Sequence, residues 1–255
     1  MVRLDILAHS TKGDRSGPPL FLVHPLGANG SFWDGCVDDL APTGLTVSVD
    51  LRGAGKSPDL TEPLTLQHIV EDLESLRSAL GLDRIVVIGC AVGAMAAAAY
   101  AHIYPNRTRA LVMSNPGMRI DGNAAAALLD RAQRVRSDGM AAIMPSAVDN
   151  AFANRPGPQR DAYARRFVAQ NAANYAWACV GASTANIEAI EVRCPTLIIA
   201  GHQDRLFGVD PARQLAHKIA GSTLVELEQG AHFIPYQTSA EFCGRVLVFL
   251  KSLET

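Results

Sequence analysis

Asp204 and His232 are the residues whose types and positions best fit chemistry on a substrate. Asp204 follows the apolar run 195–201, and His232 lies in the loop after the next apolar run, 223–227. A carboxylate bonded to an imidazole holds one tautomer and leaves the other ring nitrogen free to take a proton. Either residue alone would more often be a surface residue. At the ends of consecutive predicted strands, the two together form a candidate acid–histidine pair.

A third candidate position lies between two glycines. Gly89 and Gly93 enclose three residues, after a β-branched run and before an alanine-rich segment. This spacing predicts a sharp strand-to-helix turn in which only glycine fits the crowded flanks and the central residue is lifted above the sheet. A nucleophilic serine is expected there, but the chain has Ala91, which cannot attack a carbonyl. Cys90 comes one position too early, so we interpret it as a packing residue.

Two backbone N–H groups complete the predicted site. The run 19–24 predicts a buried strand that leads into a Pro-Leu-Gly loop. Acyl-transfer sites hold the developing oxyanion with one N–H from such a loop and one from the residue after the nucleophile. Because Pro25 has no N–H, the predicted donors are Leu26 and Val92. His24 is expected to fix the loop rather than to act as a base.

Aromatic residues are the candidates for the wall of a substrate pocket. Trp177 lies in a segment without strand character, and Phe233 directly follows the candidate histidine, so both are predicted to line the pocket. We expect Arg52 to brace its own turn rather than to bind substrate. The remaining histidines show no spacing typical of metal ligands, so no metal is assigned.

The elements needed to position these residues follow an alternating pattern. From residue 20 to residue 114 the order is strand, helix, strand, helix, strand, helix, strand, which predicts an α/β fold with a mostly parallel sheet and helices on both faces. Residues 4–8 are predicted as an edge strand, 11–19 as a loop, and Ser31 as a helix N-cap. The predicted domains are a first core part (1–116), a helical cap insertion (117–190) and a second core part (191–255).

The bulk composition narrows the class of partner. The chain has 255 residues, with 23 basic and 25 acidic side chains and a net charge of −2, so it lacks the basic surface expected for binding nucleic acid or an anionic membrane. Five cysteines without a CxxC pair suggest neither disulfides nor a zinc site. We therefore expect a cytoplasmic protein with a small-molecule substrate and no cofactor. The sequence does not give its oligomeric state.

Taken together, these motifs make the chain similar to α/β-hydrolases and, within them, to the 3-oxoadipate enol-lactonases. The general likeness is carried by residues 24–27, 50–57, 89–93, 195–204 and 230–232, and the narrower one by 131–143 and 175–179. This resemblance implies a Ser-type hydrolase in which Asp204 and His232 serve the nucleophile. The sequence departs from the family at Ala91, and it lacks the aromatic residues expected near Leu128 and Ala151.

The expected function is therefore hydrolysis of a small lactone or ester, in a form inactivated by Ala91. An engineered Ser→Ala change would leave Asp204, His232 and both elbow glycines intact, as they are here, and we favour it over a natural loss of the nucleophile. One alternative is a hydrolase of carbon–carbon bonds in a diketone or ring-cleavage product. Another is a natural non-hydrolytic or ligand-binding homologue, in which His232 acts as a base without a nucleophile.

Overall fold

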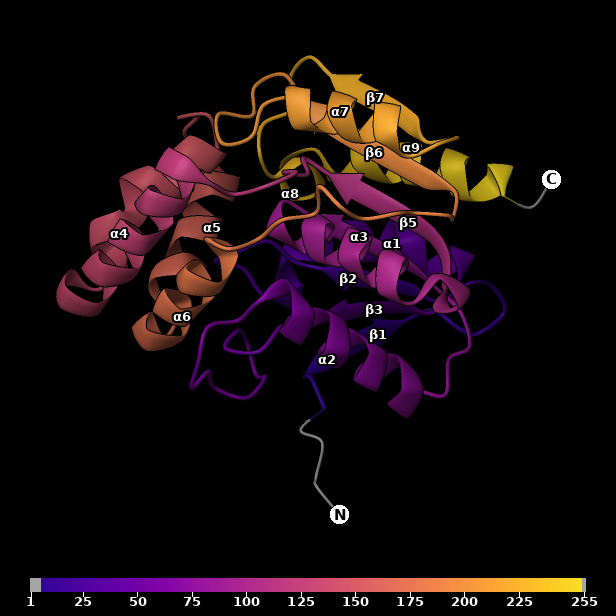
Figure 1. Ribbon diagram of the computed structural model, residues 1–255, viewed down its shortest axis with the longest axis horizontal. Coiled ribbons are helices and arrows are strands. Elements are labelled where there is room, and N and C mark those ends of the chain that lie inside the picture. The colour runs from indigo at the N-terminus through magenta and orange to yellow at the C-terminus, as the bar shows by residue number, and fades with distance from the viewer. Residues whose placement is uncertain (1–5, 254–255) are drawn as a thin grey trace.

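One twisted sheet runs through the computed structural model, which describes residues 6–253 (Figure 1). Within that part of the chain the sheet has seven strands in the order β1-β3-β2-β4-β5-β6-β7. The strands are β1 His9–Lys12, β2 Leu20–Val23, β3 Thr46–Val49, β4 Ile85–Cys90, β5 Thr108–Ser114, β6 Thr196–Gly201 and β7 Thr223–Leu227. Only the β1–β3 pair is antiparallel among these strands. The predicted α/β fold with a mostly parallel sheet is confirmed.

Helices cover both faces of the sheet, which explains why its central strands are apolar at almost every position. Ile85 and Val87 of β4 belong to one apolar cluster, whereas Val86 and Ile88 belong to the other, because successive side chains point to opposite faces. The first cluster includes residues of α2 (Leu66–Ala79), α3 (Val92–Ile103) and α7 (Asp210–Lys218). The second includes residues of α1 (Asp34–Leu40), α8 (Ile234–Gln237) and α9 (Ser239–Ser252).

The segment between β5 and β6 folds as helices that lie beside the sheet, on the left in Figure 1. We call α4 (Gly122–Asp138), α5 (Pro158–Val168) and α6 (Ala172–Ala182) the cap helices. A 3₁₀ turn, Met140–Ile143, and a π turn, Pro145–Asp149, join α4 to the residues before α5. All three helices lie within residues 117–190, which the sequence predicted to be helical.

The N-terminal edge differs from the sequence prediction. The edge strand is β1, His9–Lys12, rather than residues 4–8, and it takes up the start of the predicted loop 11–19; residues 4 and 5 lie outside the described part. All four β1 residues are exposed, and the strand is defined by its antiparallel pairing with β3. Leu7 belongs instead to the core. Hydrophobicity therefore pointed to the wrong residues, because a polar edge strand is held by backbone pairing.

The first helical turn is also capped by a different residue than predicted. Asn29 precedes a 3₁₀ turn, Gly30–Trp33, and its side-chain oxygen accepts a hydrogen bond from the Ser31 N–H at 3.0 Å. Ser31 therefore lies inside the turn rather than at its N-cap. Trp33 is fully buried, as expected of a core residue.

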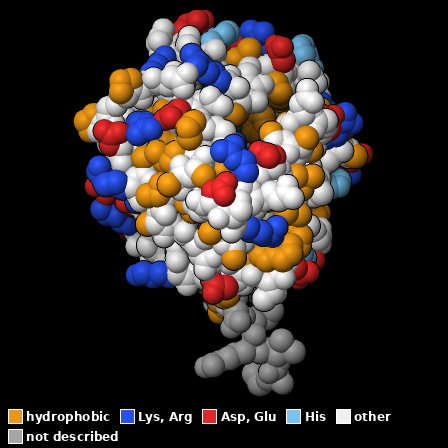
Figure 2. All heavy atoms as spheres, turned by 90° about the vertical axis from the view of Figure 1, so that its left-hand side faces the viewer, with side chains coloured by type: hydrophobic (Ala, Val, Ile, Leu, Met, Phe, Trp, Pro, Cys, Tyr) orange, Lys and Arg blue, Asp and Glu red, His pale blue; other side chains and the backbone are white. Residues whose placement is uncertain are grey.

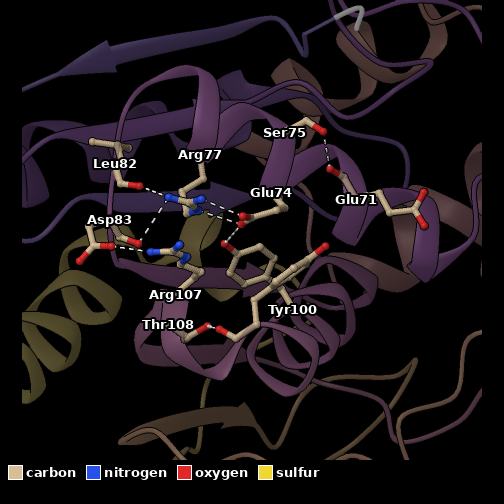
Figure 3. Close-up of polar contacts among 10 residues, drawn as sticks. Glu71, Glu74, Ser75, Arg77, Leu82, Asp83, Tyr100, Arg107 and Thr108 are labelled. Atoms are coloured by element: carbon tan, nitrogen blue, oxygen red, sulfur yellow. Dashed lines mark hydrogen bonds and ion pairs between the residues drawn. The ribbon is translucent and has the colours of Figure 1, made fainter.

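A partly buried polar network fixes α2 against α3, the helix that follows the glycine-flanked turn (Figure 3). Arg77 donates two hydrogen bonds to the carboxylate of Glu74, at 2.7 and 2.8 Å, and Tyr100 of α3 donates a third at 2.8 Å. The Arg77 contact is the main cause that lowers the pKa of Glu74. Buried polar groups carry a cost unless they are hydrogen-bonded, and here each meets a charged partner. The network therefore stabilises the orientation of α3.

Candidate active site

Ala91 forms the apex of the turn between β4 and α3. Its backbone has φ 53° and ψ −119°, a conformation that costs a non-glycine residue about 1–3 kcal/mol. The Ala91 N–H donates to the carbonyl of Ser114 at 2.9 Å, and its own carbonyl accepts from the N–H of Ala94 at 2.9 Å. The surrounding hydrogen bonds thus hold the strained turn without any contribution from the side chain.

Both flanking glycines are required by close backbone approach rather than by an unusual φ. A Cβ on Gly89 would lie 2.2 Å from the carbonyl oxygen of Gly93. A Cβ on Gly93 would lie 2.5 Å from the carbonyl oxygen of Val23 and 2.6 Å from that of His24, at the end of β2. The turn is therefore packed against the neighbouring strand, with no room for a methyl group.

We expect Gly93→Ala to lower the free energy of unfolding by about 3 kcal/mol, because the new methyl group must displace backbone atoms. Urea unfolding followed by circular dichroism measures this change. Gly244→Ala in α9 is the matched control: nothing lies within 4 Å of its added Cβ, so we expect a change of at most about 1 kcal/mol in the stabilising direction. Equal effects of the two substitutions would contradict the close packing of the turn.

The structure brings Asp204 and His232 together. The Nδ1 atom of His232 lies 3.0 and 2.9 Å from the two carboxylate oxygens of Asp204, and both residues are buried. Asp204 also accepts hydrogen bonds from the N–H groups of Leu206 at 2.8 Å and Phe207 at 3.3 Å. A carboxylate held in this way keeps the proton on Nδ1 and orients the ring. The opposite nitrogen, Nε2, has no hydrogen-bond partner within residues 6–253.

Asn115 positions both loops of this pair, and the sequence analysis did not identify it. Its side-chain amide donates to the carbonyl oxygens of Ala231 at 2.7 Å and His232 at 2.9 Å, and its side-chain oxygen accepts from the Gly201 N–H at 2.8 Å. Asn115 directly follows β5 and has φ 43°. The sequence did contain a signal for this role: an asparagine directly after a predicted parallel strand, where site residues gather. Asparagine also tolerates left-handed backbone better than most residues.

The loop that contains Leu26 is fixed from both sides. His24 Nδ1 lies 2.9 Å from the carbonyl oxygen of Pro25, and its Nε2 accepts from the Leu51 N–H at 3.0 Å. The carbonyl of Gly27 accepts hydrogen bonds from the Tyr163 hydroxyl at 2.9 Å and from the side-chain amide of Gln170 at 2.8 Å. Gln170 lies in the loop between α5 and α6. Within the described residues, neither the Leu26 nor the Val92 N–H donates a hydrogen bond. These amides remain available to a ligand.

His24 gives the fold a specific pH dependence. Burial is the largest cause that lowers its pKa below the ordinary value, so the unfolded chain takes up a proton at a higher pH than the folded chain. The stability due to neutral His24 is therefore complete above about pH 6.5 and is lost as the pH falls. We expect urea unfolding at pH 7.5 and pH 5.5 to show a larger loss of stability in the parent than in His24→Gln. An identical loss in both would contradict this role.

A cavity of about 160 Å³ connects these groups. Its floor includes Leu26, Ala91, Val92 and His232, and the cap helices close it from the other side. The wall is mainly apolar, apart from Arg131 and the two tyrosines; its further members are Pro25, Ile120, Ala124, Ala127, Leu128, Arg131, Ala147, Tyr163, Phe167, Tyr175, Ala182, Leu206, Phe207 and Phe233. The arrangement can present an imidazole and two N–H groups to one small ligand.

Two predicted site residues behave differently from each other. Phe233 lines the cavity and is buried, with its ring centroid 5.0 Å from that of Tyr163. Trp177 is not among the lining residues, so its prediction is wrong: the guanidinium of Arg136 lies 4.8 Å from the centre of its ring. Trp177 lies in α6, and the direction of a helical side chain depends on its position around the helix axis. The side chain of Trp177 packs toward α4 instead of the cavity.

Cys90 takes the structural position expected of it, whereas Arg52 does not brace its own turn as expected. The Cys90 thiol is fully buried and donates a weak hydrogen bond to the carbonyl of His232 at 3.6 Å. Burial raises its pKa well above the ordinary value, which disfavours a thiolate nucleophile. Arg52 pairs with the carboxylate of Asp72 in α2, with one hydrogen bond of 2.8 Å, rather than with carbonyls of its own turn. It therefore joins the turn to a neighbouring helix.

The sequence matches a known protein family. The family model described as alpha/beta hydrolase fold matches residues 18–238. The chain belongs to this family. This α/β-hydrolase is 27% identical over 261 residues to RutD of Caulobacter sp. (strain K31), a proposed carbamate hydrolase, with 97% of this chain and 96% of the relative covered.

The chain is also similar to proteins named as enol-lactonases. This α/β-hydrolase is 27% identical over 230 residues to 3-oxoadipate enol-lactonase 2 of Acinetobacter baylyi, with 87% of this chain and 85% of the relative covered. The crystal structure of the enol-lactonase from Burkholderia xenovorans superposes with a TM-score of 0.90, at 24% identity and 96% coverage of each chain, and shows the shared fold.

No helix within residues 6–253 is long and apolar enough to cross a membrane.

Proposed function

We propose that this α/β-hydrolase has the site of a lactonase or esterase in which Ala91 occupies the position of the nucleophile. The observation that carries this proposal is the buried Asp204–His232 pair, which shares one cavity with Ala91. The Leu26 and Val92 amides, which donate no hydrogen bond within residues 6–253, border the same space. Together these groups support a serine hydrolase site that lacks the nucleophilic hydroxyl. This supports a change that removed only the nucleophile.

The roles follow from the geometry. In a chain with a hydroxyl at position 91, His232 would take its proton through Nε2 as the oxygen attacks a carbonyl, and would later activate the hydrolytic water. Asp204 would hold the ring and stabilise the imidazolium, and the amides of Leu26 and Val92 would bind the oxyanion. With Ala91 the first step lacks its nucleophile. The chain as it stands then binds such a substrate without forming an acyl intermediate.

The cavity indicates a small substrate. A cavity of about 150 Å³ accommodates a molecule of the size of benzene, so about 160 Å³ suits one five- or six-membered ring. Arg131 of α4 lines this cavity, and its buried Nε has no hydrogen-bond partner within the described chain. Its other nitrogens donate to the Ser146 carbonyl at 3.0 Å and the Tyr175 hydroxyl at 3.4 Å. The positive charge of this guanidinium, in an otherwise largely apolar wall, favours a substrate with a carboxylate.

The substrate class is tested with a panel of lactones, enol-lactones, simple esters and 1,3-diketones, offered to the Ala91→Ser variant. We expect ring-sized lactones or enol-lactones to react fastest. Faster cleavage of the diketones would instead support a carbon–carbon bond hydrolase, which uses the same apparatus. Absence of turnover with the whole panel would contradict the proposal.

If Arg131 binds a substrate carboxylate, its replacement should affect KM for charged and uncharged substrates differently. In the Ala91→Ser background, we expect Arg131→Gln to raise KM for a carboxylated lactone about tenfold or more, because a hydrogen bond to a charged group is lost. KM for the uncharged lactone should change little. Arg134→Gln on the same helix is the control, since Arg134 does not line the cavity and its exposed guanidinium contacts the Ala142 carbonyl at 3.0 Å and the Asp130 carboxylate at 4.0 Å. Equal changes for charged and uncharged lactones would contradict a carboxylate-binding role.

A further inference from the structure

The imidazole of His232 is oriented for proton transfer, although no hydroxyl of the described residues bonds to its Nε2 atom. Asp204 binds its Nδ1 edge at 2.9 Å, while the ring lines the cavity and its Nε2 atom has no protein partner within residues 6–253. Ala91 presents only a methyl group at the same cavity. In the presence of a serine, the hydroxyl would be the hydrogen-bond partner of Nε2. The alanine leaves this lone pair open to the ligand itself.

The ring is also held rigidly. The backbone N–H of His232 donates to the Ala151 carbonyl at 3.2 Å, and the backbone carbonyl of His232 accepts from the Asn115 side chain at 2.9 Å. The rings of Phe207 and Phe233 lie next to the imidazole, with centroids 5.4 and 5.1 Å from its own. A base fixed in this way can act on a bound ligand at a defined place without prior rearrangement.

We propose that His232 in this chain removes and returns a proton at the carbon next to a bound carbonyl group, so that the cavity catalyses enolisation. The ligand is a small ketone or lactone with a hydrogen on that carbon. This inference rests on the proposed function only in taking a carbonyl compound as the ligand of the cavity. It differs in needing no nucleophile and no water.

The step balances without a further reactant. The C–H bond breaks, its proton passes to Nε2, and its electron pair forms the carbon–carbon double bond as the carbonyl π electrons move to oxygen. His232 becomes an imidazolium whose Nδ1 proton stays against Asp204. Return of a proton to the same carbon restores the ligand, with the original hydrogen exchanged for one from solvent. Return to a different carbon, in an unsaturated ligand, shifts its double bond.

The same two amides that would serve hydrolysis serve this step. An enolate carries its negative charge on the former carbonyl oxygen, as a tetrahedral intermediate does, so the N–H groups of Leu26 and Val92 can stabilise either. The cavity wall around them is largely apolar, which strengthens such hydrogen bonds relative to water. Removal of the hydroxyl therefore abolishes one reaction while it leaves the electrostatic apparatus for the other.

Hydrogen–deuterium exchange tests this inference on the chain as it is. The probe is 3-oxocyclopentane-1-carboxylate, a ring-sized ketone with a carboxylate that cannot be hydrolysed. In deuterated buffer at neutral pD, the loss of its α-proton signals is followed by proton NMR, and its binding is measured in parallel by calorimetry. We expect exchange at least about 100-fold above that in buffer alone, within the range of a positioned general base.

Two variants decide whether the imidazole carries the exchange. His232→Gln should reduce the rate to the buffer level while the ketone still binds. The control is His202→Gln, because His202 lies outside the cavity with its Nε2 atom 2.8 Å from Glu226; it should exchange at the parent rate. Exchange at the buffer level in the parent with bound ketone, or an unchanged rate in His232→Gln, would overturn the inference. Hydrolysis by Ala91→Ser would then still support the proposed function, whereas failure of any carbonyl compound to bind would remove both.

Discussion

Replacement of Ala91 by serine should raise the hydrolysis of the preferred lactone or ester by about 10⁴-fold or more. Loss of the nucleophile alone from a serine hydrolase site costs about 10⁶ in turnover, so its return to an intact site should recover much of that factor. The site has the strained turn, the Asp204–His232 hydrogen bonds at 2.9 and 3.0 Å, and the Leu26 and Val92 amides, which are unpaired in the described part of the chain. The comparison requires kcat for the parent and for Ala91→Ser on the same substrate.

The control for this gain is a hydroxyl at the neighbouring position. Cys90→Ser changes one atom at a fully buried site whose thiol already bonds to the His232 carbonyl, away from the cavity lining. We expect it to hydrolyse no faster than the parent. A similar gain from both substitutions would mean that position 91 has no special geometry, and no gain from Ala91→Ser would mean that the site is not a hydrolase site.

Removal of the negative charge beside the histidine should have the second largest effect. In the Ala91→Ser background, Asp204→Asn should lower kcat about 10⁴-fold, because an amide no longer holds the imidazole in the required tautomer. KM should change little, since Asp204 is absent from the cavity wall. Its oxygen can still accept from the Leu206 and Phe207 N–H groups, so the loop should keep its shape. Steady-state kinetics with a circular dichroism spectrum of each variant gives both results.

Asp210→Asn provides a matched control for this charge change. Asp210 begins α7 and its carboxylate is exposed, with an ion pair to Arg213 at 3.4 Å. Surface ion pairs of this kind contribute at most about 1 kcal/mol to stability, so kcat should stay within about twofold of the background. A similar loss in both variants would contradict the assignment of Asp204 to the histidine.

The central strands and the two candidate loops were predictable because their signals are local. Residues of β4 and β6 are buried on both faces and read as continuous apolar runs, and Asp204 and His232 follow strand ends. Their meeting in space follows from the rule that parallel strands end at one edge of the sheet. The β1 strand, by contrast, is exposed throughout and depends on its partner β3, which no local pattern of its own residues reveals.

The cap was harder to predict because its contacts join residues that are distant along the chain. Trp177 faces Arg136, whereas Tyr163, Phe167 and Tyr175 line the cavity. The expectation that an aromatic residue is missing near Ala151 is wrong: Phe152 is buried, and its ring centroid lies 5.5 Å from that of Tyr163 and 5.9 Å from that of Phe233.

The outer face of the cap mixes basic, acidic and hydrophobic side chains (Figure 2). Composition alone could not assign these cap side chains to the cavity or to solvent, since a helix rich in alanine has no strongly apolar stripe that marks its buried face.

Covalent trapping tests the central claim most directly. The Ala91→Ser variant is mixed with a slowly deacylating ester or lactone, quenched after one turnover and analysed by intact mass and by peptide mapping. The account predicts one acyl group per chain, attached at position 91, and no adduct on the parent or on Ala91→Ser/His232→Gln. An adduct at another residue, or rapid hydrolysis without any adduct at position 91, would contradict the claim that this site lacks only its nucleophile.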